Sequence, residues 1–259
     1  MENIWKANEE DFKDIKGITS RLIQSILDVN IRNNVDTHLN FMKKNNIDII
    51  YIEEETYPKK LKEIYDPPIC LYIKGNKEIL NNKSLAIIGC REYSEYGKGI
   101  AFKFAYDISK YKINIVSGLA RGIDSFAHLG AINANEKTVA VLGNGLDMIY
   151  PKENTKIAND ILSKGGVIIT EYPLGKKPNK FTFPARNRII SGMSDGVLVI
   201  EAKERSGTLI TVDFALEQGK DIFVIPGNID SINSYGTNEL IKQGAIVVTK
   251  KEDILDEIF

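Results

Sequence analysis

From residue 84 onward, short runs of consecutive apolar residues alternate with longer stretches of helical character, and this alternation restricts the possible folds most. The runs are continuously apolar over most of their length rather than alternating, which is typical of strands buried on both faces of a sheet. Such strands occur in parallel sheets that helices cover on both sides. The apolar runs occupy residues 85–89, 113–118, 138–143, 166–171, 196–201, 221–226 and 245–249.

The stretches between these runs have helical character, so the chain predicts an alternation of strands and helices. An apolar fraction of 43% supplies enough residues for a packed core. We therefore predict an α/β fold with a doubly wound, mainly parallel, Rossmann-like sheet flanked by helices. The helices are expected near residues 95–110, 123–134, 153–164, 184–193, 207–218 and 236–243, with a short one at the end of the chain.

The first 75 residues are more polar and predict a small helical domain followed by a connector. Gly17 interrupts a helical pattern of apolar residues. The turn is either a degenerate helix-hairpin-helix that holds a DNA phosphate on backbone amides or a plain packing unit. Residues 47–54 predict a short strand, and residues 57–76 read as a connector between domains. The predicted domains are thus 1–75 and 76–259, and we expect no C-terminal winged helix.

Composition narrows the function classes. The net charge is −1, so any binding of nucleic acid must come from a local patch. Cys70 and Cys90 form no CxxC motif, which argues against a metal site or a disulfide framework and fits a reducing cytoplasm. No apolar run approaches ~18 residues and the N-terminus lacks signal-peptide features. We expect a cytoplasmic protein without a membrane partner, a metal or a cofactor.

A basic and aromatic run at residues 176–192 supplies such a patch. It contains no acidic residue, and Phe181 and Phe183 lie among its cations. Cations interleaved with aromatic rings suit a polyanion whose bases can stack, which is single-stranded nucleic acid. On an extended segment both rings would point the same way, so either both pack inward or both face a ligand. The cations are Lys176, Lys177, Lys180, Arg186 and Arg188.

Glycine-containing turns follow several of the predicted strands. In a doubly wound sheet, ligands bind at the carboxyl ends of the strands, near a switch in strand order. Glycines let backbone amides approach an anion, and a helix N-terminus adds partial positive charge. The turns at 89–91, 117–122, 143–145 and 205–208 therefore predict a phosphate-binding rim, with Arg91 and Arg121 adding full charge. The absence of GxGxxG after the first strand and of GxxxxGK[ST] argues against a bound dinucleotide or a P-loop.

Candidate catalytic groups are few. His38 and His128 are the only histidines, and we interpret His128 as a structural residue of a helix. The carboxylates after the third, fourth and fifth predicted strands allow two interpretations. They form a cluster for hydrolysis, or they pair with Arg121, Arg186 or Arg188, and we favour the pairing. Arginines in the first turn of a helix oppose its dipole, so an anion is expected to offset them. The carboxylates are Asp147, Glu171 and Glu201.

Seven stretches of the chain together form a specific pattern. They are AIIGCREYSEYG (86–97), SGLARGIDSFAH (117–128), TVAVLGNGLDMIYPKEN (138–154), GGVIITEYPLG (165–175), FPARNRIISGMSDGVLVIEA (183–202), SGTLITVDFALEQGKDIFVIPGNI (206–229) and GTNELIKQGA (236–245). In this order, and over nearly all of residues 84–249, the chain resembles the DprA or Smf family of bacterial DNA-processing proteins. Residues 57–76 also resemble the family's linker. Cys90 stands where the family's first turn usually has serine or threonine, and Asn144 replaces a smaller residue in the turn after the third strand.

The resemblance implies a Rossmann-like core preceded by a small sterile-alpha-motif-like domain. It implies a homodimer that binds single-stranded DNA in a basic pocket, protects it and loads RecA recombinase in natural transformation, without catalysis. By position, it implies that Arg91 holds a phosphate and that Lys180 and Phe183 supply a cation and a stacking ring. Together with Arg121 from the rim, the predicted contacts are Arg91, Arg121, Lys180, Phe183, Arg186, Asn187, Arg188, Ser206, Gly207 and Thr208.

Two rival functions remain open. A related Rossmann-like family of nucleotide-hydrolysing enzymes uses a PGGxGT turn, and this chain has Gly207-Thr208 after Arg205-Ser206 instead. The alternative to the DNA-binding hypothesis is therefore a nucleotide-binding or nucleotide-hydrolysing enzyme. A third hypothesis is a nucleotide sensor that uses the same phosphate-binding rim.

Overall fold

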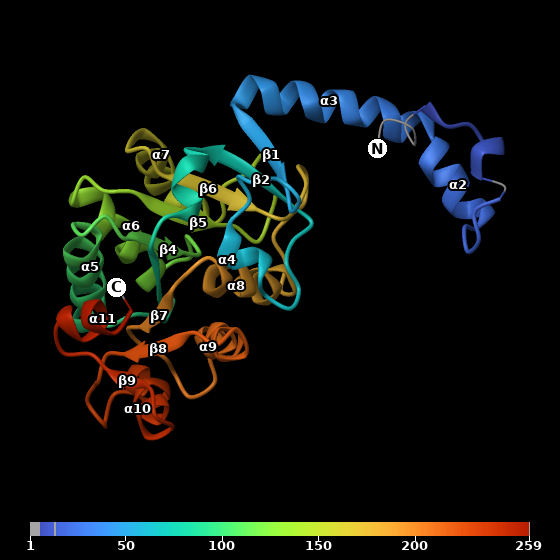
Figure 1. Ribbon diagram of the computed structural model, residues 1–259. Helices are drawn as coiled ribbons and strands as arrows, with labels where there is room; N and C mark the ends of the chain where they lie inside the picture. Colours follow the sequence, from blue (N-terminus) through green and yellow to red (C-terminus); the bar gives the residue numbers. More distant parts are fainter. Residues whose placement is uncertain (1–5, 13, 259) are drawn as a thin grey trace. The chain divides into compact units, whose positions relative to one another are not determined.

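The computed structural model describes residues 6–12 and 14–258, and its contacts divide the chain into the units Met1–Ile47 and Asp48–Phe259. The smaller unit contains a 3-10 turn η1 (Glu10–Phe12) and the helices α2 (Ser20–Leu27) and α3 (Val29–Asn45) (Figure 1). Gly17 has φ +93°, so the predicted glycine turn is present. The Thr19 hydroxyl then caps α2 by accepting a hydrogen bond from the amide of Leu22 at 3.3 Å.

The sheet contains nine strands in the order β1-β2-β6-β5-β4-β3-β7-β8-β9 (Figure 1). The seven strands from β3 to β9 pair in parallel with their neighbours in the sheet, whereas β2 runs antiparallel to β6. The predicted α/β class and mainly parallel sheet are confirmed. The strands are β1 (Ile47–Tyr51), β2 (Cys70–Gly75), β3 (Ser84–Ile88), β4 (Asn114–Ser117), β5 (Thr138–Val141), β6 (Val167–Thr170), β7 (Gly196–Val199), β8 (Asp221–Val224) and β9 (Ile246–Val247).

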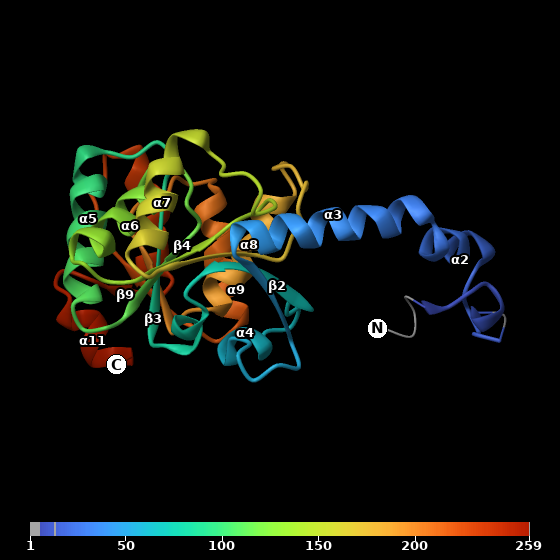
Figure 2. The ribbon, with the colours of Figure 1, turned by 90° about the horizontal axis from the view of Figure 1, so that it is seen from above.

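Helices cover both faces of this sheet, as Figures 1 and 2 show. Side chains alternate along β3: Leu85 and Ile87 belong to one apolar core, and Ala86 and Ile88 belong to the other. The first core is completed by α5 (Glu95–Ser109), α6 (Ile123–Asn133) and α11 (Glu252–Ile258). The second is completed by α4 (Lys59–Lys62), α8 (Thr182–Gly192), α9 (Gly207–Glu217) and α10 (Tyr235–Lys242), while α7 (Thr155–Ser163) lies against α6, β5 and β6.

The segment 48–75, which the sequence assigned to the first domain and its connector, contributes two strands to the sheet. β2 pairs with β6 in the register Tyr72↔Thr170. Leu71 and Ile73 alternate with more exposed neighbours and are buried. This alternation gives β2 one apolar face, which is buried in the same core as α4 and α8. The contacts accordingly separate the two units at residues 47 and 48, whereas the sequence analysis drew its boundary after residue 75.

The strand order reverses beside β3. From β3 the chain proceeds outward through β4, β5 and β6, and it then returns to the other side of β3 with β7. The loops that follow β3 and β7 therefore diverge over opposite faces, which opens a crevice at their carboxyl ends. Within the described part of the chain, no helix is both long and apolar enough to cross a membrane.

Candidate nucleic-acid interface

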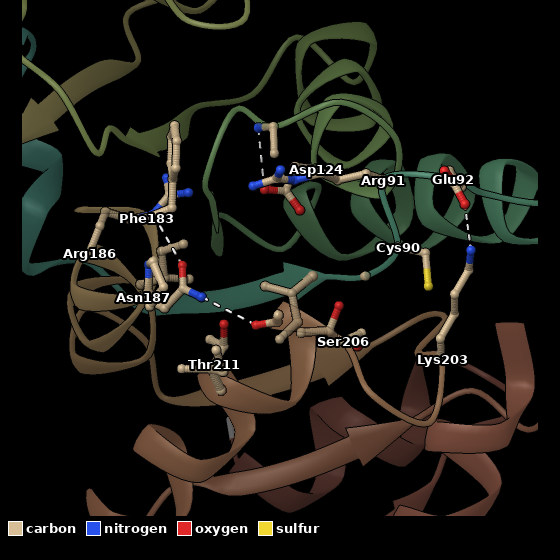
Figure 3. Close-up of a pocket in the computed structure, with 18 of the residues that line it drawn as sticks. Cys90, Arg91, Glu92, Asp124, Phe183, Arg186, Asn187, Lys203, Ser206 and Thr211 are labelled. Carbon is tan, nitrogen blue, oxygen red and sulfur yellow. Dashed lines mark hydrogen bonds and ion pairs between the residues drawn. The ribbon is translucent and has the colours of Figure 1, made fainter. Parts of the chain in front are cut away.

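A pocket of about 460 Å³ lies at this switch point (Figure 3). Its walls come from the turn after β3, the start of α6, the residues around the start of α8, and the loop from β7 into α9. Eight of the ten predicted contacts line it, and Arg121 and Arg188 do not. The eight are Arg91, Lys180, Phe183, Arg186, Asn187, Ser206, Gly207 and Thr208.

Two of these cations are exposed. Arg91 lies with its guanidinium carbon 5.5 Å from the centre of the Phe183 ring, and Lys180 places its ammonium 5.1 Å from the centre of the Phe181 ring. Neither side chain has an ion-pair partner among the described residues. Both are therefore free to bind an anion that enters the pocket.

Arg186, in contrast, is only 4% exposed. Its Nη1 donates to the carbonyl of Gly118 at 2.7 Å and to that of Val141, and its Nε donates to Oδ1 of Asn187 at 3.2 Å. Burial lowers the pKa of Arg186 to about 10, although the Asp124 carboxylate opposes this, so the side chain remains charged at neutral pH. Arg186 thus fastens α8 to the ends of β4 and β5.

Asp124 was missed by the sequence analysis. Its Oδ2 accepts hydrogen bonds from the amides of Gly118 at 3.1 Å and Ala120 at 3.4 Å, which fixes the turn after β4. Burial raises the pKa of this carboxyl, while Arg186 and the two amides lower it. The available signal was its position in the first turn of α6 directly after a glycine turn, where a carboxylate is favoured.

Arg188 and Arg121 each pair with a carboxylate outside the pocket. Arg188 donates from Nη1 and Nη2 to both oxygens of Glu171, each at 2.7 Å, and its Nε donates to the Asp66 carbonyl at 2.9 Å. Arg121 forms an exposed ion pair with Glu153. The pairing interpretation therefore applies to Arg188 and Glu171.

The other two candidate carboxylates lie apart from Glu171. Glu201 is buried at the N-terminus of α5, where it accepts a hydrogen bond from the Ser94 amide at 3.1 Å. Asp147 accepts one from the Gly175 amide at 2.9 Å. The three do not form a hydrolytic cluster, and the described residues contain no group of three or more His, Cys, Asp or Glu that fits a metal ion.

The two phenylalanines face different surroundings, which corrects the expectation of an extended segment. α8 begins at Thr182, and Phe181 already has helical backbone angles. The Asn179 side chain accepts from the amides of Phe181 at 2.8 Å and Thr182 at 3.1 Å, so it starts the helix earlier than predicted. Phe181 is 73% exposed, whereas Phe183 is half-buried, lines the pocket and lies 5.6 Å from the Tyr150 ring.

The N-terminus of α9 opens onto the same pocket. Ser206 is the N-cap residue, and its buried Oγ has no hydrogen-bond partner in the described chain. A Cβ added at Gly207 would meet open space, so no side chain crowds the start of α9 at this position. Lys203 and Glu92, which the sequence analysis also missed, line the pocket and form an ion pair of 2.5 Å.

His128 is remote from this chemistry. It is fully buried, its Nδ1 lies 2.7 Å from Oγ1 of Thr138, and burial lowers its pKa to about 3. The side chain is therefore neutral, and it does not line the pocket.

A doubly wound sheet with a basic and aromatic pocket at its switch point defines the chain as a Rossmann-like protein with a candidate anion-binding site. The family model for DNA recombination-mediator protein A matches residues 48–259, and the chain belongs to this family. The resemblance noted from the sequence is thereby confirmed.

Curated relatives and solved structures agree with this assignment. The chain is 41% identical over 242 residues to Protein Smf of Escherichia coli, and the matched region covers 93% of this chain but 64% of that protein. It is 43% identical to DprA of Streptococcus pneumoniae, covering 86% of this chain and 78% of that one. The S. pneumoniae DprA crystal structure matches with a TM-score of 0.79 and 40% identity, covering 88% of this chain and 81% of that one. A DprA structure from Helicobacter pylori, which concerns that protein's single-stranded DNA binding mode, matches with a TM-score of 0.73 and 32% identity, covering 81% of this chain and 94% of that one.

Proposed function

We propose that the chain binds single-stranded DNA in the pocket at the β3–β7 switch point, protects it and passes it to a RecA recombinase. The observation that carries this proposal is the combination of the unpaired cations Arg91 and Lys180 with the ring of Phe183 in one pocket. Cations along a groove bind phosphates, and a ring offers a platform to any base. The H. pylori relative, whose structure concerns binding of single-stranded DNA, supports the same ligand class.

The buried and paired arginines take other parts in this proposal. Arg186 and Arg188 hold α8, and with it Phe183 and Asn187, against the sheet. Both side chains of the Arg121–Glu153 pair are exposed, and water screens such surface ion pairs, so a phosphate can displace Glu153 from Arg121. Arg121 is then an outer contact for a strand that leaves the pocket.

The family also supports proposals about partners and setting. We propose a homodimer that acts in the cytoplasm in natural transformation or DNA recombination, without catalytic turnover and without a metal or cofactor. Free thiols at Cys70 and Cys90 suit a reducing compartment. Sedimentation with and without an oligonucleotide tests the dimer, and RecA filament formation on coated DNA tests the transfer.

Fluorescence anisotropy with a labelled oligo-dT strand and its duplex, over a salt series, tests the DNA-binding proposal. We expect preference for the single strand and a salt slope of about −0.7 per phosphate contacted. Arg91→Ala and Lys180→Ala should each weaken binding to all sequences alike, because phosphate contacts carry no base information. Lys177→Ala is the matched control, since Lys177 is exposed in the same segment but does not line the pocket. Equal affinity for both DNA forms, or equal binding by all three variants, would contradict the proposal.

A second candidate function is binding or hydrolysis of mononucleotides, which the pocket's volume of about 460 Å³ favours because it is typical of small-molecule sites. Release of free base from nucleoside monophosphates would establish hydrolysis. Competition by mononucleotides against the oligonucleotide at similar concentrations would establish a nucleotide sensor.

A further inference from the structure

One ion pair crosses the pocket from one wall to the other. Glu92 follows β3 and Lys203 follows β7, so its two members come from the two strands that flank the switch point. Their side chains meet at 2.5 Å between Oε2 and Nζ. In the view of Figure 3 the pair lies away from Phe183 and Asn187, beyond Cys90.

The two members of this pair differ in how firmly they are held. The Lys203 side chain is 33% exposed, whereas that of Glu92 is 84% exposed. The backbone of Glu92 is fixed, because its carbonyl accepts a hydrogen bond from Nδ2 of Asn233 at 3.0 Å. The carboxylate can therefore leave by rotation of its own side chain while the lysine stem remains packed in the pocket wall.

Lys203 also continues the anion-binding surface. It lies three residues before the N-cap Ser206, on the loop that leads into the N-terminus of α9, and both residues line the pocket. An anion bound at this N-terminus would be attracted to the Lys203 ammonium, which the Glu92 carboxylate otherwise neutralises. Water screens an exposed pair of this kind, so the pair is weak and a phosphate is able to compete with it.

We propose that Lys203 is a further phosphate contact of the pocket and that Glu92 is an internal carboxylate that competes with phosphate for it. This inference rests on the proposed binding of single-stranded DNA and adds that the Glu92–Lys203 pair limits the affinity of that binding. Glu92 keeps Lys203 neutralised in the empty pocket and repels phosphate when displaced. Binding is consequently weaker than the pocket's cations alone would give, which favours release of the strand.

A double-mutant cycle between Glu92 and Lys203 tests this competition. Binding of oligo-dT is measured for the wild type, Glu92→Gln, Lys203→Met and the double variant. Glu92→Gln should tighten binding about two- to fivefold at low salt. Lys203→Met should weaken binding and make the salt slope shallower by about 0.7. The gain from Glu92→Gln should vanish in the Lys203→Met background, because the carboxylate acts through that lysine.

Glu136→Gln is the matched control for net charge. Glu136 pairs with Lys112 at 2.7 Å just before β5 begins, at the amino ends of the strands, whereas the pocket lies at their carboxyl ends, so the substitution should leave binding unchanged. Thermal unfolding confirms that each variant is folded, and Lys203→Gln serves as a second variant if Lys203→Met is not. The inference would be overturned if Glu92→Gln raised the affinity for oligo-dT no more than Glu136→Gln does. It would also be overturned if the effect of Glu92→Gln persisted in the Lys203→Met background.

Inorganic tripolyphosphate separates this inference from the proposed function. It carries phosphates without bases, and its binding is read as a rise in Tm of each variant. If the wild type binds no oligonucleotide, yet Glu92→Gln strengthens tripolyphosphate binding only when Lys203 is present, the DNA proposal fails and the competition stands. If no variant binds either probe, the competition is overturned as well.

Discussion

Arg91 and Arg186 both line the pocket, but water reaches one guanidinium and not the other. Arg91 is exposed, lies over the Phe183 ring and has no ion-pair partner among the described residues, so its charge is available to a ligand. Arg186 donates to backbone carbonyls at the ends of β4 and β5 and lies beside Asp124. The Arg186 guanidinium therefore stabilises the fold, and substitution of Arg186 should lower the free energy of unfolding.

Arg186→Met should lower the free energy of unfolding by roughly 3–5 kcal/mol, because it leaves the buried Asp124 carboxylate without its cation. Arg91→Met should change it by less than about 0.5 kcal/mol while weakening DNA binding, since Arg91 is exposed. Urea unfolding followed by circular dichroism measures both. Equal stabilities for the two variants would show that Arg186 has no structural role.

His128 should make stability depend on pH. Burial lowers the pKa of His128 to about 3 in the folded protein, against an ordinary value of 6.5, so between these values the unfolded chain binds the extra proton. The stabilising contribution is therefore present above pH 6.5 and is lost as pH falls. Between pH 7 and 4.5 we expect the wild type to lose about 2–3 kcal/mol relative to His128→Gln, which carries no titrating ring. Parallel pH profiles for the two proteins would contradict this.

At the scale of elements, the sequence predicted the strands from β3 to β9 and the helices between them, because the strands form continuous, mainly apolar runs. α8 begins earlier than predicted because Asn179 caps it, a contact that the apolar pattern does not encode. The partners of Arg188 were also beyond pattern analysis, since Asp66 lies 122 residues away along the chain. The sequence pattern thus predicted where the pocket lies, but it did not predict which arginines are exposed and which are held by buried hydrogen bonds.

The turn after β4 should position the loop that carries Arg91. Gly122 has φ +80°, and a Cβ there would lie 2.3 Å from the Cys90 carbonyl and 2.8 Å from Cα of Arg91. Gly122→Ala should therefore strain the turn and displace Arg91, lowering stability by about 1–3 kcal/mol and weakening DNA binding.

Gly99 offers a matched control for that substitution. It lies within α5, and a Cβ there would meet open space. Gly99→Ala should stabilise the protein by roughly 0.5–1 kcal/mol and leave binding intact, because alanine is the better helix former. Urea unfolding and fluorescence anisotropy with oligo-dT, measured on both variants, test the two predictions. If Gly122→Ala bound DNA with wild-type affinity, the turn after β4 would not position Arg91 for binding.

At the scale of the whole molecule, the pocket belongs to one unit. Its lining residues run from Ile88 to Thr211, all within the unit Asp48–Phe259, and the family model matches the same residues 48–259. Both apolar cores lie in that unit as well. The larger unit therefore contains the elements that a Rossmann-like domain needs to fold and bind.

A fragment of residues 46–259, which keeps all of β1, should unfold cooperatively and bind oligo-dT with the affinity and salt slope of the full chain. The reason is that its core and its pocket are both complete without residues 1–45. Circular dichroism is the suitable unfolding probe, because the chain's single tryptophan, Trp5, is absent from the fragment. The same fragment carrying Arg91→Ala controls for binding outside the pocket. Weaker binding or a shallower salt slope in the fragment would show instead that the smaller unit, with its glycine turn at Gly17, contributes phosphate contacts of its own.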